Sequence, residues 1–232
     1  KLNSEEFFIG RGREKMITSY LYQKDFLPYY ELFKKHCPPP LSMPRGSIIC
    51  QKGLTSRWMY YLTEGMMKVY YDNYNGNERI LAYLKKNSIF GLDCFDPDKT
   101  SIVTIECLTD VWIMPFSSTT IKVMMDENKN FGYDLVKYYC KVMRQLCFDA
   151  ENQSIQDATT RLANFLFLHT DKDNDNFETI EMTQQDLASA VNCSRTTISR
   201  ICSKFKDEGI IKIKGKGISI IDKVKLEKLC RF

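Results

Sequence analysis

The 232-residue chain carries 33 Lys and Arg against 29 Asp and Glu, which gives a formal net charge of +4. Its 44% hydrophobic and 27% charged residues are typical of a globular protein and exclude a disordered, low-complexity chain. No apolar run approaches the roughly 20 residues that a membrane span requires, and the N-terminus lacks a signal-peptide pattern. We therefore expect a cytoplasmic protein with no membrane partner.

The basic charge lies in the C-terminal segment. From Thr183 onward there are 11 Lys and Arg against 5 Asp and Glu, whereas the preceding residues have 22 against 24. A basic segment on a nearly neutral chain predicts a polyanionic partner for that segment alone.

Cysteine and histidine usage argues against a metal or redox centre. The nine cysteines form no CxxC pair, which disfavours zinc-ribbon, iron–sulfur and thioredoxin-like sites. The only histidines, His36 and His169, are too few and too scattered for a metal site. A cupin-like metal-dependent enzyme therefore lacks its ligands, so we predict no enzyme, no metal and no cofactor. We expect reduced, mostly buried thiols, and a redox role for one of them is the less favoured alternative.

The N-terminal third is predicted to be a tail followed by a short helix. Residues 1–20 show no clear pattern and are interpreted as a tail. Tyr20–His36 is predicted to form one short helix after Pro28, and Pro38–Pro40 ends it.

Short apolar runs separated by turns follow from Leu41 to Ser117. Their spacing of about ten residues predicts an antiparallel barrel or sandwich, and Asn75-Gly76 predicts a tight hairpin turn. The expected strands are Ser47–Gln51, Met59–Leu62, Met66–Tyr71, Arg79–Leu84, Ser88–Gly91, Ile102–Cys107 and Val111–Pro115.

A long helix is predicted for Asn128–Ser154, with two apolar stripes. The first stripe is Leu135, Tyr139, Val142 and Leu146, and the second is Val136, Cys140, Met143 and Cys147. One stripe suffices to cover the barrel, so the second predicts pairing with a symmetry mate; burial within one subunit is the alternative.

Ala158–His169 is a further amphipathic helix. The loop Asp171–Asn176 lacks the Gly and terminal Glu of a calcium loop, which excludes calcium.

Thr183–Glu208 predicts two short helices joined by a tight turn. Thr183 with Asp186 has the capping-box form, and Ser194 is a good N-cap for the second helix. Its apolar stripe is Ile198, Ile201, Cys202 and Phe205; its polar stripe is Thr196, Ser199, Arg200 and Ser203, with Arg195 at the edge. This pattern favours a helix-turn-helix that reads the DNA major groove over an ordinary helical hairpin with a solvated face.

A basic β-hairpin, or wing, is predicted after Gly209. Ile210–Lys214 and Ile218–Ile221 are its strands. Lys212, Lys214 and Lys216 alternate with other residues and share one face, from which they reach phosphate oxygens.

The order of roll, long helix and winged helix-turn-helix resembles the Crp/Fnr family of transcription factors. In the roll the resemblance rests on Arg45–Gly53, Met59–Gly65 and Gly76–Tyr83, and in the recognition helix on Cys193–Arg200. It covers about residues 24–232. The resemblance implies an α+β fold with an antiparallel β-roll (a double-stranded β-helix like the cyclic-nucleotide-binding domain), a long dimerisation helix and a winged helix-turn-helix.

The resemblance also implies roles for the recognition helix. Arg195 and Arg200 occupy the positions of the family's guanine-reading arginines, and both fit bidentate contact with guanine. Ser199 matches the fumarate–nitrate type, whereas Thr196 departs from the usual Glu and leaves the central base of each half-site open. The expected DNA-binding set is Arg195, Thr196, Ser199, Arg200, Thr183, Ser194, Lys204, Lys214 and Lys216.

The resemblance fails at the nucleotide pocket. Cyclic-nucleotide-binding members have Phe-Gly-Glu-Leu and then Arg-Ser, whereas Phe90–Asp93 reads Phe-Gly-Leu-Asp and no Arg follows until Arg144. The stretch 87–92 is instead similar to the haloaromatic-sensing branch. A small, aromatic effector between the roll and the long helix is our hypothesis, with packing of the roll as the alternative. The candidate contacts are Tyr83, Asn87, Gly91, Tyr139 and Lys141.

These observations predict a homodimeric regulator of transcription that binds palindromic promoter DNA under control of an effector other than cyclic AMP. RNA polymerase is the expected partner if the protein activates transcription. A constitutive DNA-binding protein whose roll binds nothing is the alternative. The expected division is 1–20 tail, 21–127 β-roll, 128–155 dimerisation helix and 156–232 DNA-binding domain.

Overall fold

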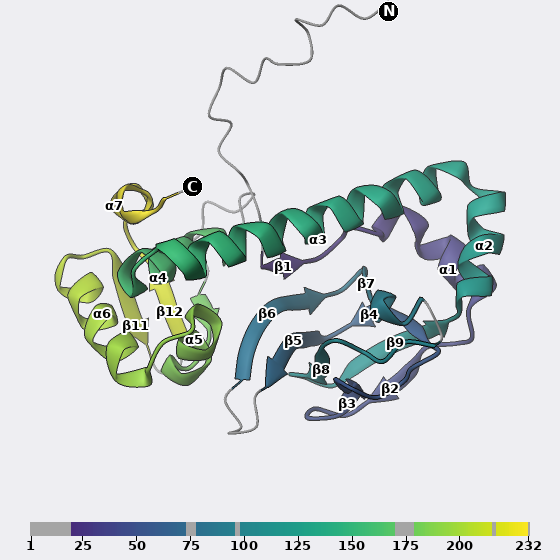
Figure 1. The fold of residues 1–232 in the computed structure, drawn as a ribbon, viewed down its shortest axis with the longest axis horizontal. Helices are drawn as coiled ribbons and strands as arrows, with labels where there is room; N and C mark the ends of the chain where they lie inside the picture. The colour runs from purple at the N-terminus through teal and green to yellow at the C-terminus, as the bar shows by residue number, and fades with distance from the viewer. Residues whose placement is uncertain (1–19, 73–77, 96–97, 170–178, 215–216, 232) are drawn as a thin grey trace, which may run out of the picture.

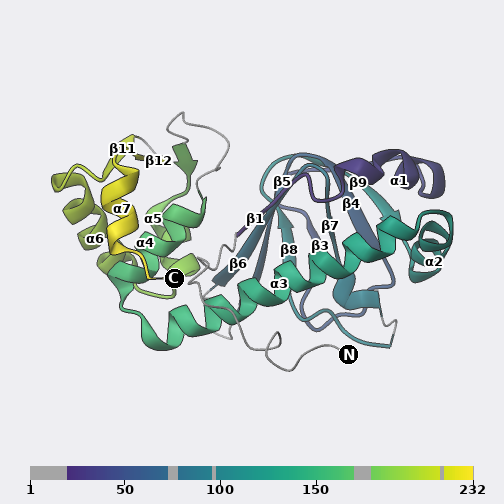
Figure 2. The same ribbon diagram turned by 90° about the horizontal axis from the view of Figure 1, so that it is seen from above.

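The computed structural model describes residues 20–72, 78–95, 98–169, 179–214 and 217–231. A sheet-rich N-terminal half lies along one side of a long helix, and a smaller helical half lies at the C-terminal end of that helix (Figures 1 and 2). The α+β architecture predicted from the sequence is confirmed.

Two sheets form the roll. One has the order β1-β6-β5-β8-β3 and the other the order β2-β9-β4-β7. All pairings in them are antiparallel except that between β1 and β6. The strands are β1 (Leu21–Tyr22), β2 (Leu41–Met43), β3 (Ile48–Cys50), β4 (Met59–Glu64), β5 (Met66–Asp72), β6 (Glu78–Lys85), β7 (Ser88–Phe90), β8 (Thr104–Cys107) and β9 (Val111–Phe116).

The N-terminal segment contains the predicted short helix and a strand that was not predicted. Helix α1 (Tyr30–His36) follows Pro28 as expected, preceded by a short 3-10 turn at Leu27–Tyr29. Leu21–Tyr22 forms strand β1, which adds to β6 in parallel with Leu21 opposite Tyr83. Phe26 N–H donates to the carbonyl of Asn87, which ties this segment to the β6–β7 turn.

Aromatic side chains fill the core of the roll. Phe33 is fully buried, with ring centroids 4.4 Å from Tyr61, 5.2 Å from Phe116 and 5.7 Å from Phe131. Tyr61 lies on β4, Phe116 on β9 and Phe131 on the long helix, so this cluster joins α1 to one sheet of the roll and to that helix. Such aromatic pairs stabilise the fold by more than the burial of their apolar surface alone.

Two helices, not one, follow the roll. Helix α2 (Ser118–Glu127), which was not predicted from the sequence, begins at N-cap Ser117, whose side chain forms a capping box with Thr120. Asn128 ends α2 in an extended conformation and its side chain caps α3 (Lys129–Ile155). At 27 residues, α3 is about 40 Å long.

The two stripes predicted for the long helix are shifted by the structure. Leu135 is buried and Val142 half-buried, but Tyr139 and Leu146 are exposed and lie with the second stripe. The buried face of α3 is instead formed by Phe131, Gly132, Leu135, Tyr138, Gln145, Phe148, Asp149 and Asn152. Tyr138 donates to the Ile89 carbonyl at 3.0 Å, so a tyrosine there packs its ring and still satisfies its hydroxyl.

A buried polar network joins Tyr20, just before β1, to β6 and α3. Asp149 forms an ion pair with Arg79 and accepts a hydrogen bond from the Tyr20 hydroxyl at 3.1 Å. Burial, followed by the charge of Asp149, raises the pKa of the Tyr20 phenol, which therefore remains a donor. A buried carboxylate needs such partners, so this network holds the end of α3 against the roll.

The C-terminal half combines helices with a three-stranded sheet. Its helices are α4 (Ala158–His169), α5 (Gln184–Val191), α6 (Arg195–Asp207) and α7 (Lys223–Leu229). The sheet has the order β10-β12-β11, with β10 at Thr179–Glu181, β11 at Ile211–Lys214 and β12 at Gly217–Ile220. The predicted wing strands are thus present.

Some sequence predictions concern residues outside the described ranges. These are the turn Asn75-Gly76, the loop Asp171–Asn176, and Gly215 with Lys216 at the tip of the wing. Within the described ranges, no helix is both long and apolar enough to cross a membrane. The same residues contain no group of three or more His, Cys, Asp or Glu that could hold a metal ion.

We expect Phe33→Ala to destabilise the protein by about 3–5 kcal/mol, because it removes a fully buried ring and leaves a cavity among three aromatic neighbours. Denaturant unfolding monitored by circular dichroism measures this loss. Leu54→Ala is the control, since Leu54 is 59% exposed in a loop and its loss should lie within about 0.5 kcal/mol of zero. Equal stabilities of the two variants would contradict the assigned core.

Candidate nucleic-acid interface

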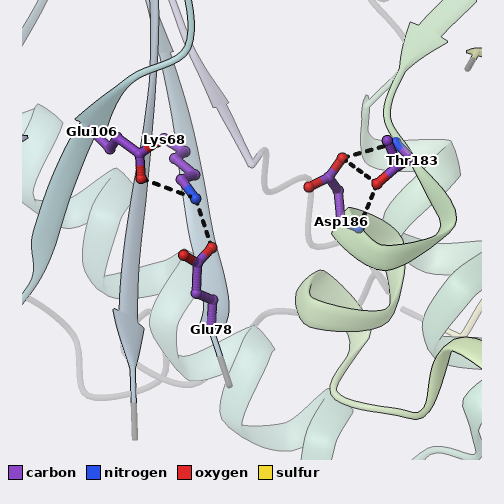
Figure 3. Close-up of polar contacts among 5 residues, drawn as sticks. All are labelled: Lys68, Glu78, Glu106, Thr183 and Asp186. Atoms are coloured by element: carbon purple, nitrogen blue, oxygen red, sulfur yellow. Dashed lines mark hydrogen bonds and ion pairs between the residues drawn. The ribbon is translucent and has the colours of Figure 1, made fainter. Parts of the chain in front are cut away.

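The first helix of the motif, α5, begins at the predicted capping box (Figure 3). The Thr183 hydroxyl oxygen accepts from the Asp186 N–H at 3.1 Å. Asp186 in turn accepts from the Thr183 N–H at 2.8 Å and from its hydroxyl at 2.6 Å. The reciprocal bonds satisfy N–H groups that have no partner inside the helix.

A left-handed residue makes the turn between the two helices. Asn192 has φ 51° and ψ 59°, a conformation that Asn tolerates better than most residues. Its carbonyl accepts from Arg161 of α4 at 3.2 Å, and Cys193 N–H returns to the Ala188 carbonyl. The contact of Arg161 with the turn was not predicted from the sequence, in which the Asn at the break of the helical pattern is the only signal for this turn. These contacts fix the angle at which α6 leaves the turn.

The second helix, α6, has two chemically distinct faces. Ile198, Ile201, Cys202 and Phe205 are buried, as the spacing predicted. Ser194 caps the helix, with its hydroxyl oxygen 3.1 Å from the Thr197 N–H. Burial raises the pKa of the Cys202 thiol to about 11, so this thiol stays protonated and packs as a small apolar group.

The structure brings the predicted reading residues together on one face. The side chains of Arg195, Thr196, Ser199 and Arg200 are exposed on α6. Thr196 and Ser194 share a hydrogen bond of 2.8 Å between their hydroxyls. A short hydroxyl held at the helix start presents a much smaller group than a glutamate would.

The remaining predicted contacts lie around this face. Thr183 and Ser194 are the exposed N-caps of α5 and α6, and Lys204 lies 3.9 Å from Glu208 on the surface of α6. On the wing, Lys212 is exposed. The side chain of Lys214 and the whole of Lys216 fall outside the described part of the chain.

The helix-turn-helix packs against the roll through β6. Ile80 and Tyr83 of β6 belong to the same buried cluster as Leu187 and Val191 of α5. Burial, followed by the charge of Asp186, raises the pKa of the Tyr83 phenol. Beside this contact Lys68 bridges Glu78 at 2.6 Å and Glu106 at 3.2 Å, and the triad appears with the capping box in Figure 3.

The five candidate effector residues do not form one cluster. Tyr83 lies under α5, whereas Asn87 accepts from the Tyr61 hydroxyl at 2.9 Å in the β6–β7 turn. Tyr139 donates to the carbonyl of Leu92, next to Gly91, and Lys141 binds Asp25 at 2.6 Å. Tyr139 and Gly91 are therefore near each other, while Lys141 is engaged by the N-terminal segment.

Two open surface hollows border Asn87, with volumes of about 240 and 480 Å³. The larger is lined by Leu27, Tyr30, Pro40, Thr63, Glu64, Lys86, Asn87 and Trp112. No residue of α3 lines either hollow. These hollows therefore differ from the expected site between the roll and the long helix.

Comparison with known proteins supports both halves of the fold. Residues 40–128 match the cyclic nucleotide-binding domain family, and residues 160–229 match the Crp-like helix-turn-helix domain family. Together the two matches account for most of the chain in the order that the structure displays.

Curated relatives align with most of the chain along most of their own length. The chain is 26% identical over 202 residues to the cAMP-activated global transcriptional regulator CRP of Escherichia coli O6:H1, covering 83% of this chain and 94% of that protein. It is 23% identical to the CRP-like cAMP-activated global transcriptional regulator of Mycobacterium tuberculosis, covering 83% and 88%.

Solved structures share the fold at low identity. CooA from Carboxydothermus hydrogenoformans gives a TM-score of 0.73 at 20% identity, with 86% of this chain and 90% of that chain covered. CprK complexed with OCPA gives 0.71 at 16% identity, with 92% and 99% covered. With the two family matches and the curated relatives, the fold and the site define a two-domain DNA-binding regulator. The chain belongs to the Crp/Fnr family of transcription regulators.

We expect Ser194→Ala to lower stability by about 1 kcal/mol, because it removes the side chain that caps α6. Chemical denaturation of the purified protein measures the change. Ser203→Ala, at an exposed mid-helix position of α6, is the matched control and should stay within about 0.5 kcal/mol of the parent. A neutral Ser194→Ala variant would argue against the observed cap.

Proposed function

We propose that this regulator acts as a homodimer whose two α6 helices enter successive major grooves of a palindromic promoter site. The observation that carries the proposal is the division of α6 into one buried face and one exposed face rich in hydrogen-bonding side chains. Helix-turn-helix dimers of this kind bind half-sites about one helical turn apart.

The dimer is supported by an exposed heptad pattern on α3. Seven residues at alternating spacings of three and four, all exposed, define an outer seam: Tyr133, Val136, Cys140, Met143, Cys147, Ala150 and Ser154. Val136 and Met143 are 60% and 61% exposed, a cost that a partner helix would remove. This exposure disfavours the alternative in which α3 is buried inside one subunit.

Within the proposed complex, Arg195 and Arg200 read guanines by bidentate hydrogen bonds, and Ser199 contacts an adjacent base. Thr196, too short to reach a cytosine amino group as Glu would, sets a different central base. The phosphate contacts, which position the helix without reading sequence, come from Thr183, Ser194, Lys204, Lys214 and Lys216.

The division into a roll (21–127), a dimerisation helix (128–155) and a DNA-binding domain (156–232) is part of this proposal. If the protein activates transcription, RNA polymerase is its further partner.

We further propose that the roll controls DNA binding through a small ligand other than cyclic AMP. At the position of the nucleotide cassette, Asp93 accepts from the Ser101 hydroxyl at 2.7 Å and from the Ile102 N–H at 2.9 Å. A carboxylate that already occupies these donors disfavours a bound phosphate. A constitutive regulator with no ligand remains the competing function, favoured by the separate engagement of Tyr83, Asn87 and Lys141.

Thermal-shift and titration screens against phenolic acids and against cyclic nucleotides separate these functions. An aromatic hit that also changes gel-shift affinity for a palindromic promoter would support the gated regulator. Tight binding of cyclic AMP would contradict our assignment of the cassette. DNA binding unchanged by every compound would support the constitutive regulator.

We expect Arg195→Ala and Arg200→Ala each to reduce discrimination between specific and random DNA by about 1–3 kcal/mol, because each loses a bidentate contact to guanine. Fluorescence anisotropy with a palindrome selected from a randomised DNA pool measures both affinities. Lys212→Ala is the control, since loss of a phosphate contact weakens binding to all sequences alike. Equal loss on specific and random DNA for either Arg variant would overturn its reading role.

A further inference from the structure

The outer seam of α3 contains two thiols. Cys140 and Cys147 are free, exposed and seven residues apart. We propose that they are modification sites at which each cysteine forms a disulfide with its own copy in the second subunit, locking the dimer covalently. This inference rests on the homodimer proposed above and adds to it a specific pairing and a chemistry.

The heptad pattern places both cysteines at equivalent positions of the seam. Counting from Tyr133, the positions 133, 140, 147 and 154 repeat every seven residues, with Val136, Met143 and Ala150 between them. In a parallel two-stranded coil, residues at such a core position face their own counterparts across the two-fold axis. Each cysteine then lies opposite the same cysteine of the partner copy.

The position of the DNA-binding domain requires the parallel arrangement. That domain lies at the C-terminal end of α3, which is about 40 Å long (Figures 1 and 2). In an antiparallel pair the two recognition helices would lie at opposite ends of the coil, where they could not bind adjacent half-sites on one DNA. A parallel pair places both on the same side.

Accessibility separates these two thiols from the other described cysteines. Cys50, Cys107, Cys202 and Cys230 are buried, and Cys37 and Cys193 are only partly exposed. Burial raises the pKa of Cys37 and Cys107 to about 11, which suppresses the reactive thiolate there. A disulfide between Cys140 and Cys147 of one chain is excluded, because seven residues of helix separate them by about 10 Å, beyond the span of a disulfide.

The oxidation proceeds by exchange with a small disulfide such as oxidised glutathione. In a free subunit, where the seam is exposed, the Cys140 thiolate attacks one sulfur of glutathione disulfide and releases one glutathione thiolate, which takes up a proton. The Cys140 thiolate of the second copy then attacks the protein sulfur of the mixed disulfide and releases the second glutathione. Two protein thiols are oxidised, one glutathione disulfide is reduced, and the same exchange applies at Cys147.

The test uses full-length protein treated with oxidised glutathione and run on non-reducing gels. The variants are Cys140→Ser, Cys147→Ser and the double variant, with Cys193→Ser as the matched control outside the seam. We expect covalent dimer from the parent, the control and both single variants, since each remaining seam cysteine still faces its own copy. The double variant should lose at least nine-tenths of the covalent dimer.

Two outcomes would overturn the pairing. Covalent dimer from the double variant would assign the cross-link to another cysteine. Loss of cross-linking in both single variants would mean that Cys140 pairs with Cys147 of the second copy, as in an antiparallel or staggered coil.

Light scattering under reducing conditions keeps this inference distinguishable from the proposed dimer. A parent that is dimeric when reduced but gives no covalent dimer with oxidised glutathione would overturn the disulfide while leaving the dimer intact. A reduced parent that scatters as a single 27.1 kDa chain would overturn the dimer itself and the disulfide with it.

Discussion

The fold depends on the way in which α3 satisfies the polar backbone of the roll with one face while leaving the other exposed. Tyr138 donates to the carbonyl of Ile89, and Gln145 donates to the carbonyl of Leu81. Buried carbonyls without partners are costly, so these bonds fix both the rotation and the height of the helix on the roll. Once that face is fixed, geometry alone decides which residues point outward and form the seam.

The helices α6 and α3 show which parts of the fold can be predicted from the sequence and which cannot. The faces of α6 follow from one 3.6-residue period, a capping serine and a turn residue, all of which are local signals. On α3, however, Tyr138 and Tyr139 are adjacent and chemically identical. Periodicity cannot decide which of them covers the roll, because that choice is made by the Ile89 carbonyl, a partner 49 residues away.

For a related reason, the sequence could not predict strand β1 or the contacts of the effector candidates. β1 has two residues, too few to show alternation, and it pairs in parallel through its backbone. Tyr83 lies opposite β1 and beneath α5, and Lys141 contacts Asp25 just after β1, its ammonium lying 4.7 Å from the centre of the Tyr22 ring. Residues that resemble a ligand site in sequence therefore share their contacts with the N-terminal segment and the DNA-binding domain. The roll, the helix and the recognition motif are coupled through the same few side chains.

The short strand β1 also has a protective role during the life of the folded chain. Without it, β6 would be the outer strand of its sheet, and the backbone of Tyr83 and Leu84 would lose the partner strand that now pairs with it. Unpaired strand edges are templates for pairing with other chains and for aggregation. The N-terminal segment covers part of that edge with the two residues of β1, and Tyr20, Tyr22 and Phe26 hold the segment in place. Removal of the segment by a protease would therefore leave the regulator prone to aggregation.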